Sequence, residues 1–489
     1  MCGILGIVAP HPVGNDLVCG LTALQHRGQD AAGVVTLSDR FHMKKGAGLV
    51  TNVFATPADT EALQGHAGLG HVRYATQGTT SVFDAQPFAV HYPFGLAMVH
   101  NGNVTNFAAL RQRLNTDHHR LIQTTNDVEL ILYTLAAELE RKNLAHLTVD
   151  DLFASVRSLF GKVDGAYSVI TLIAGKGMLA FRDANGIRPL IFGKRQTPNG
   201  PSYAFASEST CFDYLGYELV RELAPGEAVL VTRDGQVHSS GAKPACGSFC
   251  AFEFIYFARE DATMNGTLVA RERVRAGKLL ARRVREAGLV PDIVIDVPSS
   301  AYFAASGLAE ELGIPYRRGL TKNNHVGRSF IVPSQVERER LVRQKLNPIR
   351  EVVAGKKVAV VDDSIVRGTT SKHIVRLLRD AGAAEVYFCS AAPPILHRCV
   401  YGIDMATKKE IIAANHTLDE VRAYIGADAV VYQSLEDLKD VYRDVAGCFA
   451  CFSGVYPTEV GEETLGVIEA ERELRQSERV NYGALAGGR

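Results

Sequence analysis

The chain has 489 residues, 46% of them apolar, and its 53 Lys plus Arg residues balance 53 Asp plus Glu residues. This length exceeds what one hydrophobic core supports, so we expect two or three domains. With no net charge, no global field recruits nucleic acid or a membrane surface, and an anionic ligand needs a local site. No segment resembles a membrane span or a secretory signal, so we expect a cytoplasmic protein that binds neither membranes nor nucleic acid.

The first candidate functional residue is Cys2, which follows Met1 directly. Once Met1 is removed, one residue carries both a thiol and a free α-amine, and their usual pKa values near ~8.5 and ~8 let the amine accept the thiol proton. The alternative is an accidental cysteine at a frayed terminus. Residues 3–9 form an apolar run typical of a strand, which favours a fixed nucleophile.

Short apolar strands with turn signals between them continue to about residue 235. The strand at residues 68–76 carries Arg73, and the strand at residues 96–100 ends before Asn101 and Gly102. Because Asn-Gly supplies the positive φ of a tight turn, a hairpin is the simplest interpretation of the segment that follows residue 100. Asp127 precedes an apolar helix, where helix capping explains a carboxylate equally well.

Hydrolysis of a glutamine amide needs a nucleophile, two oxyanion donors, a cation for the substrate carboxylate and an anion for its ammonium group. Residues 2–4, 26–30, 71–76 and 100–103 resemble the glutaminase domain of N-terminal-nucleophile amidotransferases. The resemblance implies two stacked antiparallel sheets between helices, an α+β fold. It implies that Cys2 is nucleophile and base, and that Asn101 and Gly102 form the oxyanion hole. The implied glutamine-site residues are Arg27 as support, Arg73 and Thr76 for the carboxylate, and Asp127 for the ammonium group. While Met1 stays attached, we expect an inactive glutaminase.

The second half alternates strands with long helices, which is typical of a mostly parallel α/β sheet. We expect strands at residues 291–298, 314–317 and 356–361, and a helix at residues 299–312. The strand at 356–361 leads into a loop of acidic, small and hydroxyl residues and then into an amphipathic helix. This order aims backbone N–H groups at a phosphate, although no Walker loop is present.

Asp362 and Asp363 at that strand end suit a ribose diol and Mg²⁺, whereas the alternative is a solvated or capping pair. The segment resembles the phosphoribosyl diphosphate motif of type I phosphoribosyltransferases. The resemblance implies that Asp362 and Asp363, with Ser300, hold one Mg²⁺ per subunit. It implies a lid at residues 319–330, in which Lys322 and Arg328 reach the diphosphate. The implied 5′-phosphate loop comprises Ser364, Ile365, Val366, Arg367, Gly368, Thr369 and Thr370. The basic helix expected at residues 336–345 is either a solvated face or a phosphate contact.

Nine cysteines in such a chain are expected to be catalytic, metal-binding or buried thiols. Four of them can form a thiolate site for zinc or an iron–sulfur cluster, and their spacing does not decide between the two. These four are Cys250, Cys399, Cys448 and Cys451. They resemble the iron–sulfur branch of two-domain amidotransferases, which implies one [4Fe–4S] cluster per subunit.

Together these patterns predict a glutaminase domain at residues 1–235, a phosphoribosyltransferase domain with the cysteine site at 236–460, and a C-terminal helix and flexible tail at 461–489. The resemblance implies that ammonia from glutamine attacks phosphoribosyl diphosphate, which gives 5-phosphoribosylamine, glutamate and diphosphate in the first committed step of purine synthesis. It also implies inhibition by purine nucleotides and a homotetramer. The alternative is a non-catalytic sensor of phosphoribosyl diphosphate or nucleotides on the same fold.

Overall fold

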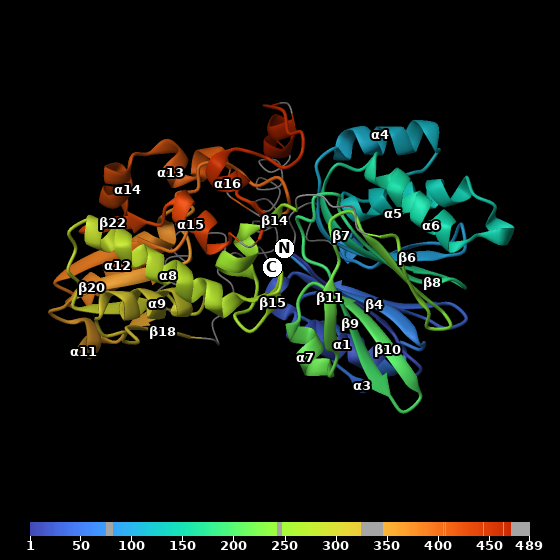
Figure 1. The fold of residues 1–489 in the computed structure, drawn as a ribbon, viewed down its shortest axis with the longest axis horizontal. Helices are drawn as coiled ribbons and strands as arrows, with labels where there is room; N and C mark the ends of the chain where they lie inside the picture. Colours follow the sequence, from blue (N-terminus) through green and yellow to red (C-terminus); the bar gives the residue numbers. More distant parts are fainter. Residues whose placement is uncertain are drawn as a thin grey trace, which may run out of the picture.

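The computed structural model describes residues 1–74, 82–241, 247–323, 346–403, 405, 407–443, 445–462 and 464–470. Two halves lie side by side, and the N-terminus lies where they meet (Figure 1). In the described residues, no helix is long and apolar enough to cross a membrane.

The first half stacks two antiparallel sheets, as the sequence predicted. The strands of the first sheet, in spatial order, are β11 (Glu218–Glu222), β9 (Ile191–Thr197), β10 (Gly200–Ala206), β1 (Gly3–Val8), β4 (Ala67–Arg73), β2 (Ala31–Leu37) and β3 (Phe41–Ala47). Those of the second sheet are β13 (Val237–Ser239), β12 (Ala228–Thr232), β8 (Gly177–Arg182), β7 (Gly165–Ile173), β6 (Leu96–Val104) and β5 (Phe88–Val90). The second sheet therefore continues past residue 235, where we placed the domain boundary.

Successive side chains point to opposite faces of each strand, so the apolar side chains of this half form three layers: one between the two sheets and one on the outer face of each sheet. Ile4 of β1 packs between the sheets with Val99 and Ile170, whereas Leu5 faces the helices that cover the first sheet. Helices α4 to α6 cover the outer face of the second sheet (Figure 1). The helical segments of this half are α1 (Gly14–Ala23), η1 (Gln25–Arg27), α2 (Val50–Val53), α3 (Pro57–Glu61), η2 (Val82–Asp84), α4 (Phe107–Asp117), α5 (Asp127–Glu140), η3 (Leu144–His146), α6 (Val149–Phe160) and α7 (Thr210–Leu215).

The second half is built on a parallel sheet in the order β17 (Ile293–Asp296), β20 (Lys357–Asp362), β21 (Glu385–Ser390) and β22 (Ala429–Tyr432). Apolar side chains from helices cover both faces of this sheet, as expected for parallel strands. The helical segments are η4 (Glu253–Phe257), α8 (Val269–Glu286), α9 (Tyr302–Leu312), α11 (Arg350–Val353), α12 (Thr369–Asp380), η6 (Lys408–Glu410), α13 (Ile412–Asn415), α14 (Leu418–Ile425), α15 (Leu435–Val441) and α16 (Ala450–Ser453).

Three pairs of short strands complete this half: β14 (Phe249–Cys250) with β23 (Gly447–Cys448), β15 (Thr263–Met264) with β16 (Thr267–Leu268), and β18 (Leu320–Lys322) with β19 (Leu346–Pro348). The strand expected at residues 314–317 is wrong, because only a single bridge joins Tyr316 to Val294 there. The basic helix expected at residues 336–345 lies outside the described residues. Of the C-terminal segment, residues 464–470 are helical.

Helices α8 and α9 pack with their backbones in close contact. A Cβ atom on Gly277 of α8 would lie 2.0 Å from the carbonyl oxygen of Ala304, and one on Gly307 of α9 would lie 2.2 Å from that of Val274. Both distances are far below van der Waals contact, so only glycine fits at the two positions. This crossing fixes α8 against the sheet that carries the acidic pair.

Candidate active sites

Strand β1 places Cys2 at the end of the first sheet, between β4 and β10. The residue is buried, with 8% of its surface exposed. Its backbone nitrogen donates to Oδ1 of Asn101 at 3.2 Å, and its Sγ donates to the carbonyl oxygen of Tyr74 at 3.6 Å. The thiol and nitrogen of residue 2 therefore both have defined positions beside Asn101.

The strand expected to end at His100 continues through Asn101 and Gly102 as part of β6, so the alternative of a hairpin turn there is wrong. Pairing with β7 extends the strand through both residues to Val104. Gly102 has a φ of 155°, and a Cβ atom there would lie 1.9 Å from the carbonyl oxygen of Ala166, so glycine is required. The Nδ2 atom of Asn101 is buried and has no hydrogen-bond partner in the described part of the chain. A buried amide donor without a partner, beside a thiol, can stabilise an oxyanion.

Arg73 and Asp127 are the buried cation and the buried anion that the motifs singled out. Arg73 ends β4, and its Nη2 lies 4.0 Å from Oδ2 of Asp84, a carboxylate that the motifs did not single out. Asp127 begins α5 and accepts a hydrogen bond from the backbone nitrogen of Val104 at 3.1 Å. Thr76 lies outside the described residues.

Arg27 is buried and contacts the backbone of Cys2. Its Nε donates to the carbonyl oxygen of Cys2 at 3.0 Å. Its terminal nitrogens pair with Glu208 and with Glu253, which lies in the second half of the chain. Burial alone would raise the pKa of Glu208. The charges of His26 and Arg27 outweigh this effect and lower that pKa to about 2. The geometry therefore favours a supporting role for Arg27, through the backbone of residue 2.

The acidic pair follows β20 at the carboxyl edge of the parallel sheet. Ser300 and Ser364 donate their hydroxyl protons to Asp363, the latter at 2.8 Å, and the backbone nitrogen of Asp363 donates to Oδ1 of Asp362 at 3.0 Å. Burial raises the pKa of both carboxyl groups, and the charge of Asp363 raises that of Asp362 further. Two crowded carboxylates and a hydroxyl oxygen are a donor set that suits Mg²⁺.

The loop predicted to bind phosphate runs directly into α12. Gly368, with a φ of 72°, caps the helix, and Thr369 is its first residue. The first amides of this twelve-residue helix therefore point toward the loop. Arg367 pairs with Glu410 at 3.2 Å, which leaves its guanidinium half exposed. Lys322 ends β18, and Arg328 lies outside the described residues.

The four cysteines predicted to bind a metal lie in one hydrophobic core. Cys250 and Cys448 face each other in the β14–β23 pair, and the backbone nitrogen of Tyr401 donates to Sγ of Cys399 at 3.3 Å. Burial and the charges of nearby cysteines raise the pKa of the Cys250 thiol to about 11. The same effects raise the pKa of the Cys451 thiol. Four thiols are, by their chemistry, the donor set of an iron–sulfur cluster or of zinc. Within the described ranges, no three His, Cys, Asp or Glu residues are arranged for a single metal ion.

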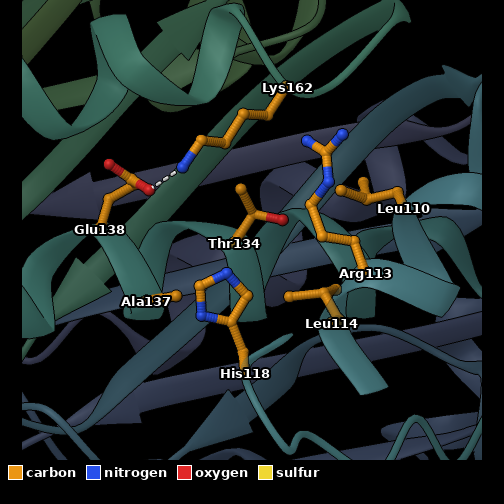
Figure 2. Close-up of a pocket in the computed structure, with 8 residues that line it drawn as sticks. All are labelled: Leu110, Arg113, Leu114, His118, Thr134, Ala137, Glu138 and Lys162. Carbon is orange, nitrogen blue, oxygen red and sulfur yellow. Dashed lines mark hydrogen bonds and ion pairs between the residues drawn. The ribbon is translucent and has the colours of Figure 1, made fainter. Parts of the chain in front are cut away.

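A small pocket lies away from these residues, between α4, α5 and Lys162 (Figure 2). Its volume of about 10 Å³ is room for one water molecule, and an ion pair between Lys162 and Glu138 closes one side. None of the predicted site residues lines it. The chemistry of the side chains therefore locates the active sites better than this cavity does.

The two folds and their sites define a glutamine amidotransferase joined to a phosphoribosyltransferase. Residues 71–214 match the family model of the glutamine amidotransferase domain, and residues 270–398 match that of the phosphoribosyl transferase domain. Amidophosphoribosyltransferases of Haemophilus influenzae and Saccharomyces cerevisiae are 44% and 43% identical to this chain. The matches cover 96% and 97% of this chain and 96% of each relative.

Solved structures agree with these relatives. Glutamine phosphoribosylpyrophosphate amidotransferase from B. subtilis, complexed with ADP and GMP, is 39% identical with a TM-score of 0.83, over 94% of this chain and 98% of that one. The chain belongs to the amidophosphoribosyltransferase family, whose members catalyse the glutamine-dependent first step of purine biosynthesis. This membership supports the predicted enzyme over the non-catalytic sensor. It does not distinguish the iron–sulfur branch.

Proposed function

We propose that Cys2 is the nucleophile that releases ammonia from glutamine. The observation that carries this proposal is the contact between residue 2 and Asn101, whose Oδ1 accepts from the backbone nitrogen while its Nδ2 has no partner in the described residues. After removal of Met1, that nitrogen is an amine that can take the thiol proton. The thiolate attacks the amide carbon, ammonia leaves, and water then hydrolyses the thioester to glutamate.

The charge that develops on the amide oxygen during both steps needs donors already in place. Nδ2 of Asn101 and the backbone N–H of Gly102 would supply them. Arg73 would bind the carboxylate of glutamine with help from Thr76, and Asp127 would bind its ammonium group. Because Arg73 and Asp127 carry opposite charges, they would bind different groups of glutamine and favour one orientation of the molecule.

The second site would bind phosphoribosyl diphosphate at the carboxyl edge of the parallel sheet. The loop from Ser364 to Thr370 would hold the 5′-phosphate at the N-terminus of α12. Asp362 and Asp363 would accept from the ribose hydroxyls and, with Ser300, hold one Mg²⁺. When bound, Mg²⁺ neutralises charge on the departing diphosphate. Lys322 and Arg328 would add positive charge there.

At this site, the ammonia nitrogen forms a bond to C1 of the ribose while the bond from C1 to the diphosphate breaks. Because ammonia is protonated in bulk water, it must travel from Cys2 without meeting solvent. The burial of Cys2 at the junction of the halves supports direct transfer.

The four cysteines would hold one [4Fe–4S] cluster, as in the iron–sulfur branch of the family. Such a cluster would join the chain segments around residues 250, 399 and 450. Iron and sulfide analysis of protein prepared without oxygen, with a visible spectrum, tests the assignment. Colourless protein that contains zinc would refute it, and so would colourless metal-free protein.

Inhibition by nucleotides and the assembly state complete the proposal. The B. subtilis relative was solved with ADP and GMP, which supports inhibition of this chain by purine nucleotides at the phosphoribosyl site. Inhibition assays with each nucleotide test this point. A homotetramer is the predicted assembly, and its mass in solution tests it.

The Cys2→Ala variant tests the nucleophile. We expect it to lose glutamine-driven synthesis and to keep synthesis from ammonium salts, because the second site is untouched. Glutamine-driven turnover in this variant would refute the role of Cys2. A sensor would bind phosphoribosyl diphosphate, yet wild-type protein would form no product from either nitrogen source.

A further inference from the structure

Four charged side chains lie buried together beneath Cys2, where the two halves meet. Arg27, Arg188 and Glu208 come from the first half, and Glu253 comes from the second. None of the four side chains has any exposed surface. The two positive and two negative charges balance, so the group is neutral as a whole.

Glu253 is the centre of this group. Its Oε1 accepts from Nη2 of Arg27 at 2.9 Å and its Oε2 accepts from Nη1 at 3.0 Å, so the pair is bidentate. Oε1 also lies 3.4 Å from Nη1 of Arg188. A bidentate pair fixes the plane of a guanidinium as well as its position. The Nε donor of Arg27 therefore points in one direction, toward the carbonyl oxygen of Cys2.

Glu253 stands at an unfavourable place for a carboxylate. It begins the π-helix η4, within an otherwise apolar run from Cys250 to Phe257. Arg273 of α8 holds this helix through the carbonyl oxygens of Phe254 and Ala258, both at 2.7 Å. A buried carboxylate is costly in such a run, and π-helices occur frequently at functional sites.

We propose that Glu253 is a positioning residue for the glutaminase reaction: by fixing Arg27, it holds the backbone of residue 2 and thereby aims the Cys2 thiol. The inference rests on the proposed role of Cys2 as nucleophile. It means that the glutaminase site of the first half is complete only when the second half is docked against it.

Glu253→Gln in the full chain tests the proposal, because glutamine cannot balance two buried guanidinium groups. We expect kcat with glutamine to fall about 100-fold, as for a nucleophile displaced by about 1 Å. The KM for glutamine should not change, since Arg73 and Asp127 are untouched. Synthesis from ammonium salts should keep its wild-type rate, which also shows that the variant is folded.

Two further variants test whether Glu253 positions Cys2 or only stabilises the fold. Glu253→Asp keeps the charge with a shorter side chain, so its kcat with glutamine should lie between wild type and Glu253→Gln. Glu272→Gln is the matched control: it removes another buried carboxylate, which pairs with Thr267 and Arg271 of its own half. The control should lose no glutamine-driven activity relative to ammonia-driven activity.

Equal loss of both activities in Glu253→Gln would overturn the proposal, as would an unchanged kcat with glutamine. If Glu253→Gln does not fold, Glu253→Asp decides by the same comparison: a loss confined to glutamine supports positioning, and an equal loss refutes it. The rate at which iodoacetamide alkylates Cys2, measured on the N-terminal peptide, should change in parallel with kcat. Failure of the nucleophile assignment is separate, because it shows as glutamine turnover in Cys2→Ala.

Discussion

The backbone nitrogen of Cys2 and the amide oxygen of Asn101 are joined by a hydrogen bond of 3.2 Å. One side chain thus touches the nitrogen that would act as base, while its other polar atom, Nδ2, is left for the substrate. The two functions of Asn101 can be separated, because aspartate retains an acceptor oxygen and lacks the amide donor.

Asn101→Asp should therefore keep Cys2 in place and lose the oxyanion donor. We expect kcat with glutamine to fall by about 10²–10³, the usual effect of removing one such donor, and synthesis from ammonium salts to persist. Steady-state kinetics with both nitrogen sources measure this. Asn106→Asp is the control, since Asn106 donates its amide to Lys162 away from the thiol. An Asn101→Asp enzyme with normal glutamine kinetics would contradict the oxyanion assignment.

Asp363→Asn should strongly reduce synthesis from both nitrogen sources, because it weakens the proposed hold on Mg²⁺ and ribose. Loss of this charge stabilisation is expected to reduce the ammonia-driven rate by about 10²–10³. Hydrolysis of glutamine without phosphoribosyl diphosphate should remain unchanged, and an assay of glutamate release measures it. Asp380→Asn, at the far end of α12, is the control. Full ammonia-driven activity in Asp363→Asn would rule out the second site as described.

Glu208 should make the protein sensitive to acid. Its pKa falls from 4.5 to about 2 in the folded chain, so folding favours the ionised form. The stability this adds is complete above the unfolded pKa and is lost as the pH falls from about 4.5 toward 2; the shift corresponds to roughly 3 kcal/mol. Denaturant titrations across this range should show a steeper loss for wild type than for Glu208→Gln. Parallel curves would contradict the shift.

Gly277→Ala should destabilise the second half. The new methyl group would lie 2.0 Å from the carbonyl oxygen of Ala304, so α8 and α9 would have to separate. Overpacking of this kind costs about 1–3 kcal/mol, and thermal unfolding should show a lower Tm. Gly461→Ala is the control, because a Cβ atom there would meet open space. Equal Tm values for the two variants would contradict the close packing described.

Short motifs in the sequence were enough to predict both folds and to name Cys2, Asn101 and Arg27, which the structure brings together. They ended the strand at His100 and left a hairpin turn as the alternative, and both are wrong, because Asn-Gly chemistry describes a local preference and the pairing of β6 with β7 overrides it. Proposed roles for Lys322 and the 5′-phosphate loop remain predictions.

The buried charges were missed for a different reason. Glu208, Glu253 and Arg188 stand in no motif, and their partners lie far along the chain. A signal was present, since Glu253 interrupts an apolar run and a charge in such a place needs a buried partner. The sequence could not name that partner, because it does not show which distant segments meet.

The buried position of Met1 bears on the base proposed for Cys2. Only 1% of its surface is exposed, and its Sδ lies 2.8 Å from Nη1 of Arg188, whose Nε donates to Tyr401 of the second half. In this arrangement the nitrogen of residue 2 belongs to an amide, and an amide cannot accept the thiol proton. A chain that keeps Met1 would therefore lack the base that the proposed glutaminase step needs.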